Sequence, residues 1–149
     1  MERIIRTSSL HIDFIHLVSL LDADLARRDG EENAFYAQFN GISQLEQCVV
    51  YYKDDIAVGC GALKSFDEES MEIKRMYVSM AYRGKGIATL LLAELEKWAK
   101  ELGYMYCVLE TGLRQPEAVA LYKKNNYHLI PNYPPYEHMA NSVCFRKKL

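Results

Sequence analysis

Apolar residues between positions 86 and 102 recur at the spacing of an amphipathic helix. The stripe comprises Ile87, Leu91, Leu95, Trp98 and Leu102, at intervals of four, four, three and four residues, which places them on one helical face. On the polar side, Glu96 with Lys100 and Lys97 with Glu101 have the i,i+4 spacing of ion pairs. The pattern predicts the strongest helix of the chain, which Gly103 is expected to end.

A less regular helix is predicted near the N-terminus. Ser8 and Ser9 are its candidate N-caps. It would carry the apolar residues Ile12, Ile15, Leu17, Leu20, Leu21 and Leu25. The densely charged stretch 22–32 should end it around Asp29-Gly30, and a weaker helix is expected from Asn33 to about Phe39, before Asn40-Gly41.

The remaining apolar runs are short, β-branched and aromatic, which is typical of strands. We expect strands at 48–52, 56–63, 71–78, 104–110, 127–130 and 142–148, with a short first strand around Ile4 and Ile5. Thr111-Gly112 is interpreted as a turn, and Pro116 as the start of a shorter helix that reaches Tyr122. Antiparallel hairpins followed by alternating strands and helices predict a mixed α+β fold with a twisted sheet.

Composition limits the class of protein. The chain has 149 residues, of which 50% are hydrophobic and 26% charged, with a formal net charge of −2. That is one typical globular domain, and without a linker or repeat we interpret residues 1–149 as a single domain. The N-terminus lacks the apolar core of a signal peptide and no run is long enough to cross a bilayer, so a cytoplasmic location without membrane association is expected. A pI near 6.1 argues against a general nucleic-acid binder.

Cysteines and histidines do not indicate a metal centre. Cys48, Cys60, Cys107 and Cys144 occur singly, mostly in apolar runs, so they are interpreted as small buried residues in a reducing compartment. The four histidines lack the spacing of metal ligands. The expectation is therefore no metal.

The segment Arg83-Gly84-Lys85-Gly86-Ile87-Ala88 stands between a predicted strand and the strongest helix. Two glycines let the backbone turn tightly, and free N–H groups at a helix start favour an anion such as a pyrophosphate. A Walker loop is excluded, and a dinucleotide-binding fingerprint fails because Thr89 occupies its third glycine position. A glycine turn without a ligand remains the alternative.

The motif Arg83-x-x-Gly86-x-Ala88, preceded by Tyr77-Val78, resembles the acetyl-CoA loop of the GNAT N-acetyltransferases. Downstream, Gln115-x-x-Ala118-x-x-Leu121-Tyr122-x-x-x-Asn126-Tyr127 resembles the second signature of that family. The resemblance covers roughly residues 48–148. Gln115 stands where the family often has asparagine, Asn126 replaces a glycine, and Met80 replaces a common proline.

The resemblance implies a sheet whose central strands, here 71–78 and 104–110, splay apart to admit the pantetheine arm. It implies acetyl-CoA as co-substrate. The cofactor-binding residues would be Tyr77, Val78, Arg83, Gly84, Lys85, Gly86, Ile87, Ala88 and Gln115. Acetyl transfer to an amine would be direct, without an acyl-enzyme, and a homodimer would be in keeping with the family.

Catalysis requires a base, because a primary amine with a pKa near 10.4 is protonated at neutral pH. Glu72 is the candidate base by its resemblance to the family's glutamate position, and strand alternation predicts residues 72, 74, 76 and 78 on one face. Glu110 and a water chain are the alternatives. Tyr122 matches the tyrosine general acid of the family, and a backbone N–H around Val78 would stabilise the oxyanion.

The acceptor would be bound by residues 22–41 and the loop 132–139. Tyr133, Tyr136 and His138 are candidate pocket residues, with Glu137 or Glu31 attracting a cation; a rigid exposed turn is the alternative. A small-molecule amine is the preferred acceptor. A protein N-acetyltransferase and a non-catalytic acetyl-CoA sensor or partner module remain open.

Overall fold

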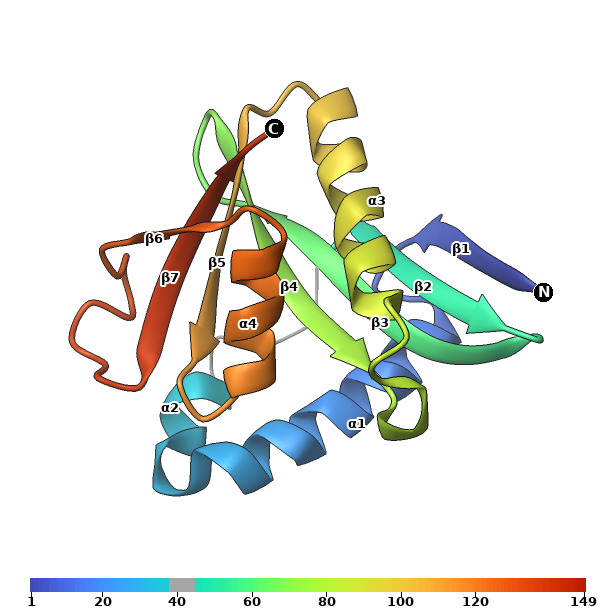
Figure 1. The fold of residues 1–149 in the computed structure, drawn as a ribbon, viewed down its shortest axis with the longest axis horizontal. Helices are drawn as coiled ribbons and strands as arrows, with labels where there is room; N and C mark the ends of the chain where they lie inside the picture. The colour runs from blue at the N-terminus through green and yellow to red at the C-terminus, as the bar shows by residue number, and fades with distance from the viewer. Residues whose placement is uncertain (38–44) are drawn as a thin grey trace.

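A computed structural model describes residues 1–37 and 45–149, which form a seven-stranded sheet flanked by helices (Figure 1). The elements are β1 (Glu2–Thr7), α1 (Ile12–Asp29), η1 (Gly30–Glu32), α2 (Asn33–Ala37), β2 (Gln47–Lys53), β3 (Ile56–Ser65), β4 (Ser70–Val78), η2 (Met80–Tyr82), α3 (Ile87–Glu101), β5 (Tyr106–Gly112), α4 (Pro116–Lys124), β6 (His128–Ile130) and β7 (Ser142–Lys148). The strand order is β1-β2-β3-β4-β5-β7-β6. The mixed α+β fold expected from the sequence is confirmed.

The sheet opens at its centre. β4 and β5 are parallel, whereas the other neighbouring strands are antiparallel. Their paired register runs only from Ser70 opposite Tyr106 to Glu72 opposite Val108. Beyond that point the two strands have no paired register, as the expectation of splayed central strands required.

Two apolar cores lie on opposite faces of the sheet. On one face, α3 and α4 cover a core that includes Leu91, Leu95 and Phe145, and these helices are turned toward the viewer in Figure 1. On the other face, Phe14 and Leu17 of α1 pack against residues of β2 and β3. Each face therefore has its own helical cover, and the opening between β4 and β5 connects the two sides.

A β-bulge in β4 overturns the prediction that residues 72, 74, 76 and 78 share one face. Arg75 has φ of 59°, and the register with β3 shifts between Cys60 and Ala62. Lys74 pairs with Ala62, which belongs to the core under α1, whereas Met76 and Val78 contribute to the core under α3. The extra residue interrupts the alternation of side chains between the two faces of the sheet. After the bulge, the even-numbered residues of β4 therefore lie on the face opposite to those before it.

The start of α1 also differs from expectation. His11 is the N-cap, and its Nδ1 accepts a hydrogen bond of 3.2 Å from the Asp13 N–H, a role predicted for Ser8 or Ser9. Ile12, Ile15 and Leu20 are exposed rather than core residues. The helix ends at Gly30 as predicted, with φ of 56°.

Two other boundaries need correction or lie out of reach. β5 begins at Tyr106 rather than Tyr104, and Thr111 and Gly112 are strand residues rather than a turn, because they pair with Val143 and Ser142 of β7. The helix predicted from Asn33 is present through Ala37. Its predicted end near Phe39 and the stop at Asn40-Gly41 lie outside the described residues.

Candidate active site

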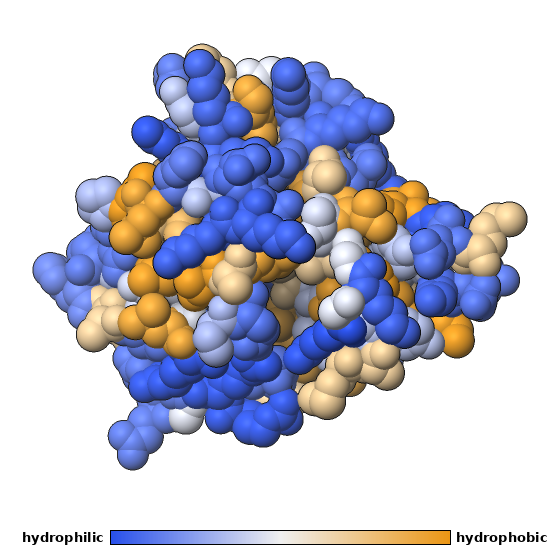
Figure 2. Space-filling model, viewed as in Figure 1, coloured by the Kyte–Doolittle hydropathy of each residue, from blue (hydrophilic) through white to orange (hydrophobic). Residues whose placement is uncertain are grey.

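Two cavities meet where β4 and β5 separate. The larger, about 430 Å³, lies on the α3 and α4 side, and the smaller, about 100 Å³, extends toward α1 and α2. Five residues line both: Leu21, Met76, Gln115, Ala118 and Tyr122. The face in Figure 2, seen as in Figure 1, carries apolar side chains among a mainly hydrophilic surface. Because the two cavities share these five residues, a ligand in the larger cavity could reach a second molecule in the smaller one.

The glycine loop forms one end of the larger cavity. Gly84 and Gly86 have φ of 78° and 83°, a left-handed conformation that suits glycine. The hydrogen bond from the Leu90 N–H to the Gly86 carbonyl, 3.1 Å, is the first of α3, so the preceding N–H groups have no intrahelical acceptor. A Cβ on either glycine would meet no atom within 4 Å. The loop is therefore an open cradle of N–H groups at a helix N-terminus, which suits a phosphate group.

Most of the predicted cofactor-binding residues are brought together here. The residues of that set that line the larger cavity are Tyr77, Val78, Arg83, Gly84, Gly86, Ile87, Ala88 and Gln115. Lys85 does not line it, and its ammonium group lies over the Tyr82 ring at 5.6 Å. The loop therefore presents its backbone and Arg83 to the cavity, and Lys85 lies beside it.

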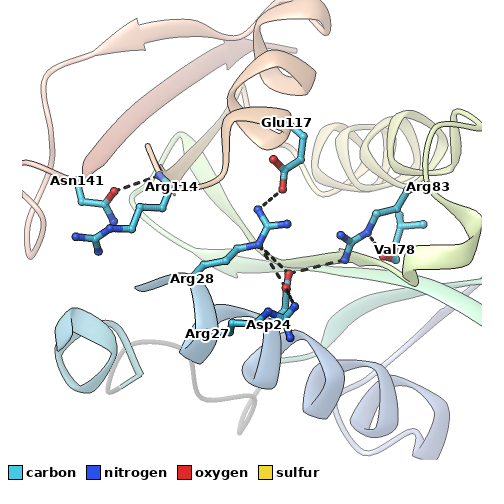
Figure 3. A network of polar contacts seen from close by, with 8 residues as sticks. All are labelled: Asp24, Arg27, Arg28, Val78, Arg83, Arg114, Glu117 and Asn141. Atoms are coloured by element: carbon cyan, nitrogen blue, oxygen red, sulfur yellow. Dashed lines mark hydrogen bonds and ion pairs between the residues drawn. The ribbon is translucent and has the colours of Figure 1, made fainter. Parts of the chain in front are cut away.

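Arg83 is already engaged inside the protein. Its Nε donates a hydrogen bond of 2.7 Å to the Val78 carbonyl, and its Nη2 lies 3.8 Å from a carboxylate oxygen of Asp24. These contacts connect the loop to β4 and to α1 (Figure 3). Asp24 thus balances part of the positive charge of Arg83 that was expected to attract a phosphate.

Sequence reasoning missed a charged network between α1 and α4. In Figure 3, Arg28 reaches from α1 toward both Asp24 and Glu117. Asp24 and Glu117 line the larger cavity. The i,i+4 spacing of Asp24 and Arg28 could have predicted their ion pair. Glu117 lies 89 residues from Arg28, so no local sequence pattern indicated that contact.

Tyr122 occupies the junction of the two cavities. It is 6% exposed and packs edge-on against Tyr127, with ring centroids 5.8 Å apart. Burial raises the pKa of its phenol, with a further contribution from the nearby Glu110. The hydroxyl therefore keeps its proton at neutral pH and is available as a donor.

Glu110 projects into the smaller cavity from β5. Burial is the main cause that raises the pKa of its carboxyl to about 7, partly offset by a hydrogen bond to Ser142 and by the charge of Lys74. A carboxyl group with that pKa exchanges a proton readily near neutral pH. Its position and its pKa suit a general base.

Glu72 lies on the same sheet face but lines neither cavity. It is 8% exposed and accepts a hydrogen bond of 2.8 Å from the Tyr133 hydroxyl. The Tyr133 ring in turn packs against Phe66, 4.7 Å between centroids. This contact explains how the 132–139 loop is held on the sheet, and the catalytic role predicted for Glu72 stays a prediction.

The predicted acceptor segments supply only part of the smaller cavity. Leu25, Asp29 and Tyr36 line it from the first segment, of which residues 38–41 lie outside the described residues. Tyr133 and Tyr136 are instead buried in a separate cluster with Tyr36. The exposed side chains proposed to contact the acceptor, Glu31, Glu137 and His138, do not line the cavity.

The four cysteines are buried and free, as predicted. Burial raises the pKa of Cys60 and Cys107 to about 12, so their thiols are protonated at neutral pH and unsuited to nucleophilic attack. Across residues 1–37 and 45–149, no group of three His, Cys, Asp or Glu side chains is placed to hold a metal ion. Within these same ranges, no helix has the length and apolar character needed to cross a membrane.

Comparison with known sequences agrees with the geometry. The model of the acetyltransferase (GNAT) family matches residues 15–127. The chain is 30% identical over 148 residues to the IAA acetyltransferase of Azospirillum brasilense, with 98% of this chain and 97% of that protein covered. It is 37% identical over 90 residues to an N-acetyltransferase of Xenopus tropicalis, which covers 60% of this chain but only 44% of that relative.

Solved structures show the same fold. A provisionally named acyl-CoA N-acyltransferase from Klebsiella pneumoniae superimposes with a TM-score of 0.83 and 30% sequence identity, covering 100% of this chain and 98% of that chain. A GNAT family acetyltransferase from Elizabethkingia anophelis with acetyl-CoA bound has a TM-score of 0.69 and 19% identity, covering 99% and 98%.

Proposed function

The chain belongs to the acetyltransferase (GNAT) family, and from that premise we propose that it transfers the acetyl group of acetyl-CoA directly to a primary amine of a small molecule. The observation that carries the proposal is the meeting of the two cavities at Tyr122. One cavity ends in a cradle of N–H groups, and the other holds a carboxyl group with a pKa of about 7. The arrangement suits a ternary complex of cofactor and acceptor.

Acetyl-CoA would occupy the larger cavity. Its pyrophosphate would lie at Arg83–Ala88, where the N–H groups at the start of α3 favour an anion. Its pantetheine arm would follow Tyr77 and Val78 into the opening between β4 and β5, with Gln115 on the opposite side. That path would bring the thioester to Tyr122, which lines both cavities.

We assign the base to Glu110, the alternative candidate from the sequence. As a carboxylate it takes one proton from the acceptor ammonium group and later releases it to solvent. The free amine then attacks the thioester carbonyl, and a backbone N–H near Val78 stabilises the oxyanion. Glu72 remains the second candidate, and its hydrogen bond with Tyr133 suggests that it instead positions the acceptor loop.

Collapse of the tetrahedral intermediate breaks the carbon–sulfur bond. The Tyr122 phenol donates its proton to the leaving thiolate, and the remaining proton on nitrogen restores the phenol. The products are one amide, one thiol of CoA and one released proton. A protonated phenol in a site shielded from water suits this role.

The first test is calorimetric titration with acetyl-CoA, followed by thiol release from the complex with a panel of primary amines. The panel includes amino acids, polyamines, aminoglycosides and a lysine-containing peptide. We expect saturable acetyl-CoA binding and thiol release with at least one small amine. Absence of acetyl-CoA binding would contradict the proposal; release with the peptide alone would favour a protein N-acetyltransferase, and binding without release would favour a sensor.

A further inference from the structure

The bulge at Arg75 places two consecutive basic side chains on one face of β4. Lys74 lies on the α1 face through its pairing with Ala62, and Arg75 forms an ion pair with Asp22 of α1. In a regular strand, neighbouring side chains point to opposite faces. Here both residues line the smaller cavity, beside Glu110.

These two cations are incompletely paired. No hydrogen bond or ion pair within 4 Å joins the Lys74 ammonium group to any part of the chain that the structure describes. Burial lowers the pKa of Lys74, against the attraction of the Glu72 and Glu110 carboxylates, neither of which lies within ion-pair distance. The Arg75 side chain is 1% exposed, and its Nε is a buried donor without a hydrogen-bond partner among the described residues.

Burial also disfavours the charged form of the acidic side chains of this cavity, Asp29 and Glu110. Asp29 is 5% exposed, and burial raises the pKa of its carboxyl despite the opposing charges of Arg114 and Arg28. The Arg114 Nη1 also donates a hydrogen bond of 3.0 Å to the Asp29 carbonyl. Lys74 and Arg75 thus retain unused donors in a cavity where burial disfavours the charged form of Asp29. Unused donors in a cavity indicate an anionic group on the ligand.

We propose that the acceptor is a small amino carboxylate, whose carboxylate is bound by the Lys74 ammonium group while its amine faces Glu110. The inference rests on the proposed function and specifies its substrate class. Arg75, the next residue, lines the same cavity, and its ion pair with Asp22 leaves its Nε without a partner among the described residues. The cavity volume is about 100 Å³, against about 430 Å³ for the larger cavity, which suits a compact polar head group.

The same charges argue against a diamine. A second ammonium group would need a carboxylate as its partner, and burial raises the pKa of the Asp29 carboxyl, so the cavity disfavours the charged form of that partner. It would also be repelled by Lys74 and Arg75. A neutral monoamine would leave the donors of Lys74 without a partner.

The test compares matched acceptors that differ only at the carboxylate. The probes are glycine, alanine, serine, methionine, phenylalanine, β-alanine and γ-aminobutyrate, each beside its carboxamide. Thiol release with acetyl-CoA gives kcat/KM, and calorimetry on the protein saturated with CoA gives the binding constant. We expect at least one acid to exceed its amide by about tenfold or more in both measurements, because a hydrogen bond to a charged group typically contributes that much.

The variant Lys74→Met keeps an unbranched side chain of similar length and removes its charge. It should raise KM for the preferred acid about tenfold and abolish the preference over the amide, with the dissociation constant of acetyl-CoA unchanged. Lys64→Met is the matched control, at an exposed position of β3 outside both cavities. It should leave both the KM for the acid and the preference for the acid over the amide unchanged.

Equal use or binding of acids and amides would overturn the inference, as would a preference that survives Lys74→Met or failure of every probe to bind. Thiol release with amides or simple amines alone would overturn it while supporting the acetyltransferase. If acids bind in preference to amides but no thiol is released, the proposed reaction fails and the anion site stands.

Discussion

The larger and the smaller cavity share Tyr122 but are built in different ways. The larger is lined mainly by residues close in sequence, the 76–89 segment and α4, and much of its recognition uses backbone N–H groups. The smaller gathers charged side chains from α1, β4 and β5, among them Asp29, Lys74 and Glu110. Backbone recognition tolerates changes of side chain, whereas a cavity of buried charges depends on each of them. The cofactor half is therefore expected to resist mutation better than the acceptor half.

The largest effect should come from Glu110→Gln. Loss of the proton acceptor is expected to lower kcat/KM by about 100-fold or more, the usual contribution of a general base, with acetyl-CoA affinity unchanged. Thiol release and calorimetry measure the two quantities. Glu72→Gln is the matched control; a larger loss there than at Glu110 would return the base to Glu72.

The pH dependence should follow the same group. Because the base must be ionised and its pKa is about 7, kcat/KM is expected to rise about tenfold per pH unit below pH 7 and to level off above it. A profile that is flat between pH 5 and 8 would remove Glu110 from the base role.

Stability should change in the opposite direction. The pKa of Glu110 is raised in the folded state from an ordinary 4.5 to about 7, so folding favours the neutral carboxyl. Its contribution to the free energy of unfolding is fully present below about pH 4.5 and is lost as pH rises to about 7. Urea denaturation measures the free energy of unfolding of the protein and of Glu110→Gln across this window. The contribution lost as pH rises should be present in the unmodified protein and absent from Glu110→Gln.

Tyr122→Phe tests the junction. We expect kcat to fall at least about tenfold because the leaving thiolate loses its proton donor, while the packing of the ring against Tyr127 is preserved. Acetyl-CoA binding, followed by calorimetry, should stay as it was. Unchanged turnover would exclude the acid role.

The smallest effect is expected at the cradle. Arg83→Ala should weaken acetyl-CoA binding only about threefold to tenfold, since backbone groups bear most of the recognition and Asp24 already balances part of the charge. Lys85→Ala, whose side chain lies outside the cavity, is the matched control and should leave the dissociation constant unchanged. A loss of binding beyond a hundredfold in Arg83→Ala would show that the side chain, and not the backbone, dominates.

Local patterns predicted the elements well and their charged partners poorly. The 3.6-residue period located α3, and its buried residues Leu91 and Leu95 are those of the predicted stripe. In contrast, Glu96 binds Lys147 at 2.8 Å and Glu101 binds Arg6 at 2.7 Å, rather than the lysines four residues away. Ion pairs depend on which elements meet, and that information is spread over the whole chain.

Sequence alone determined the order of helices and strands and the glycine turn before α3, because each depends on residues close to one another in the chain, and resemblance to a family motif singled out Tyr122. Only the tertiary structure decided the bulge at Arg75, the burial that raises the pKa of Glu110, and the placing of Glu72 against Tyr133. Strand register and burial arise from contacts between segments distant in sequence. The smaller cavity is therefore a property of the fold, whereas the glycine loop at the end of the larger one can be recognised in the sequence.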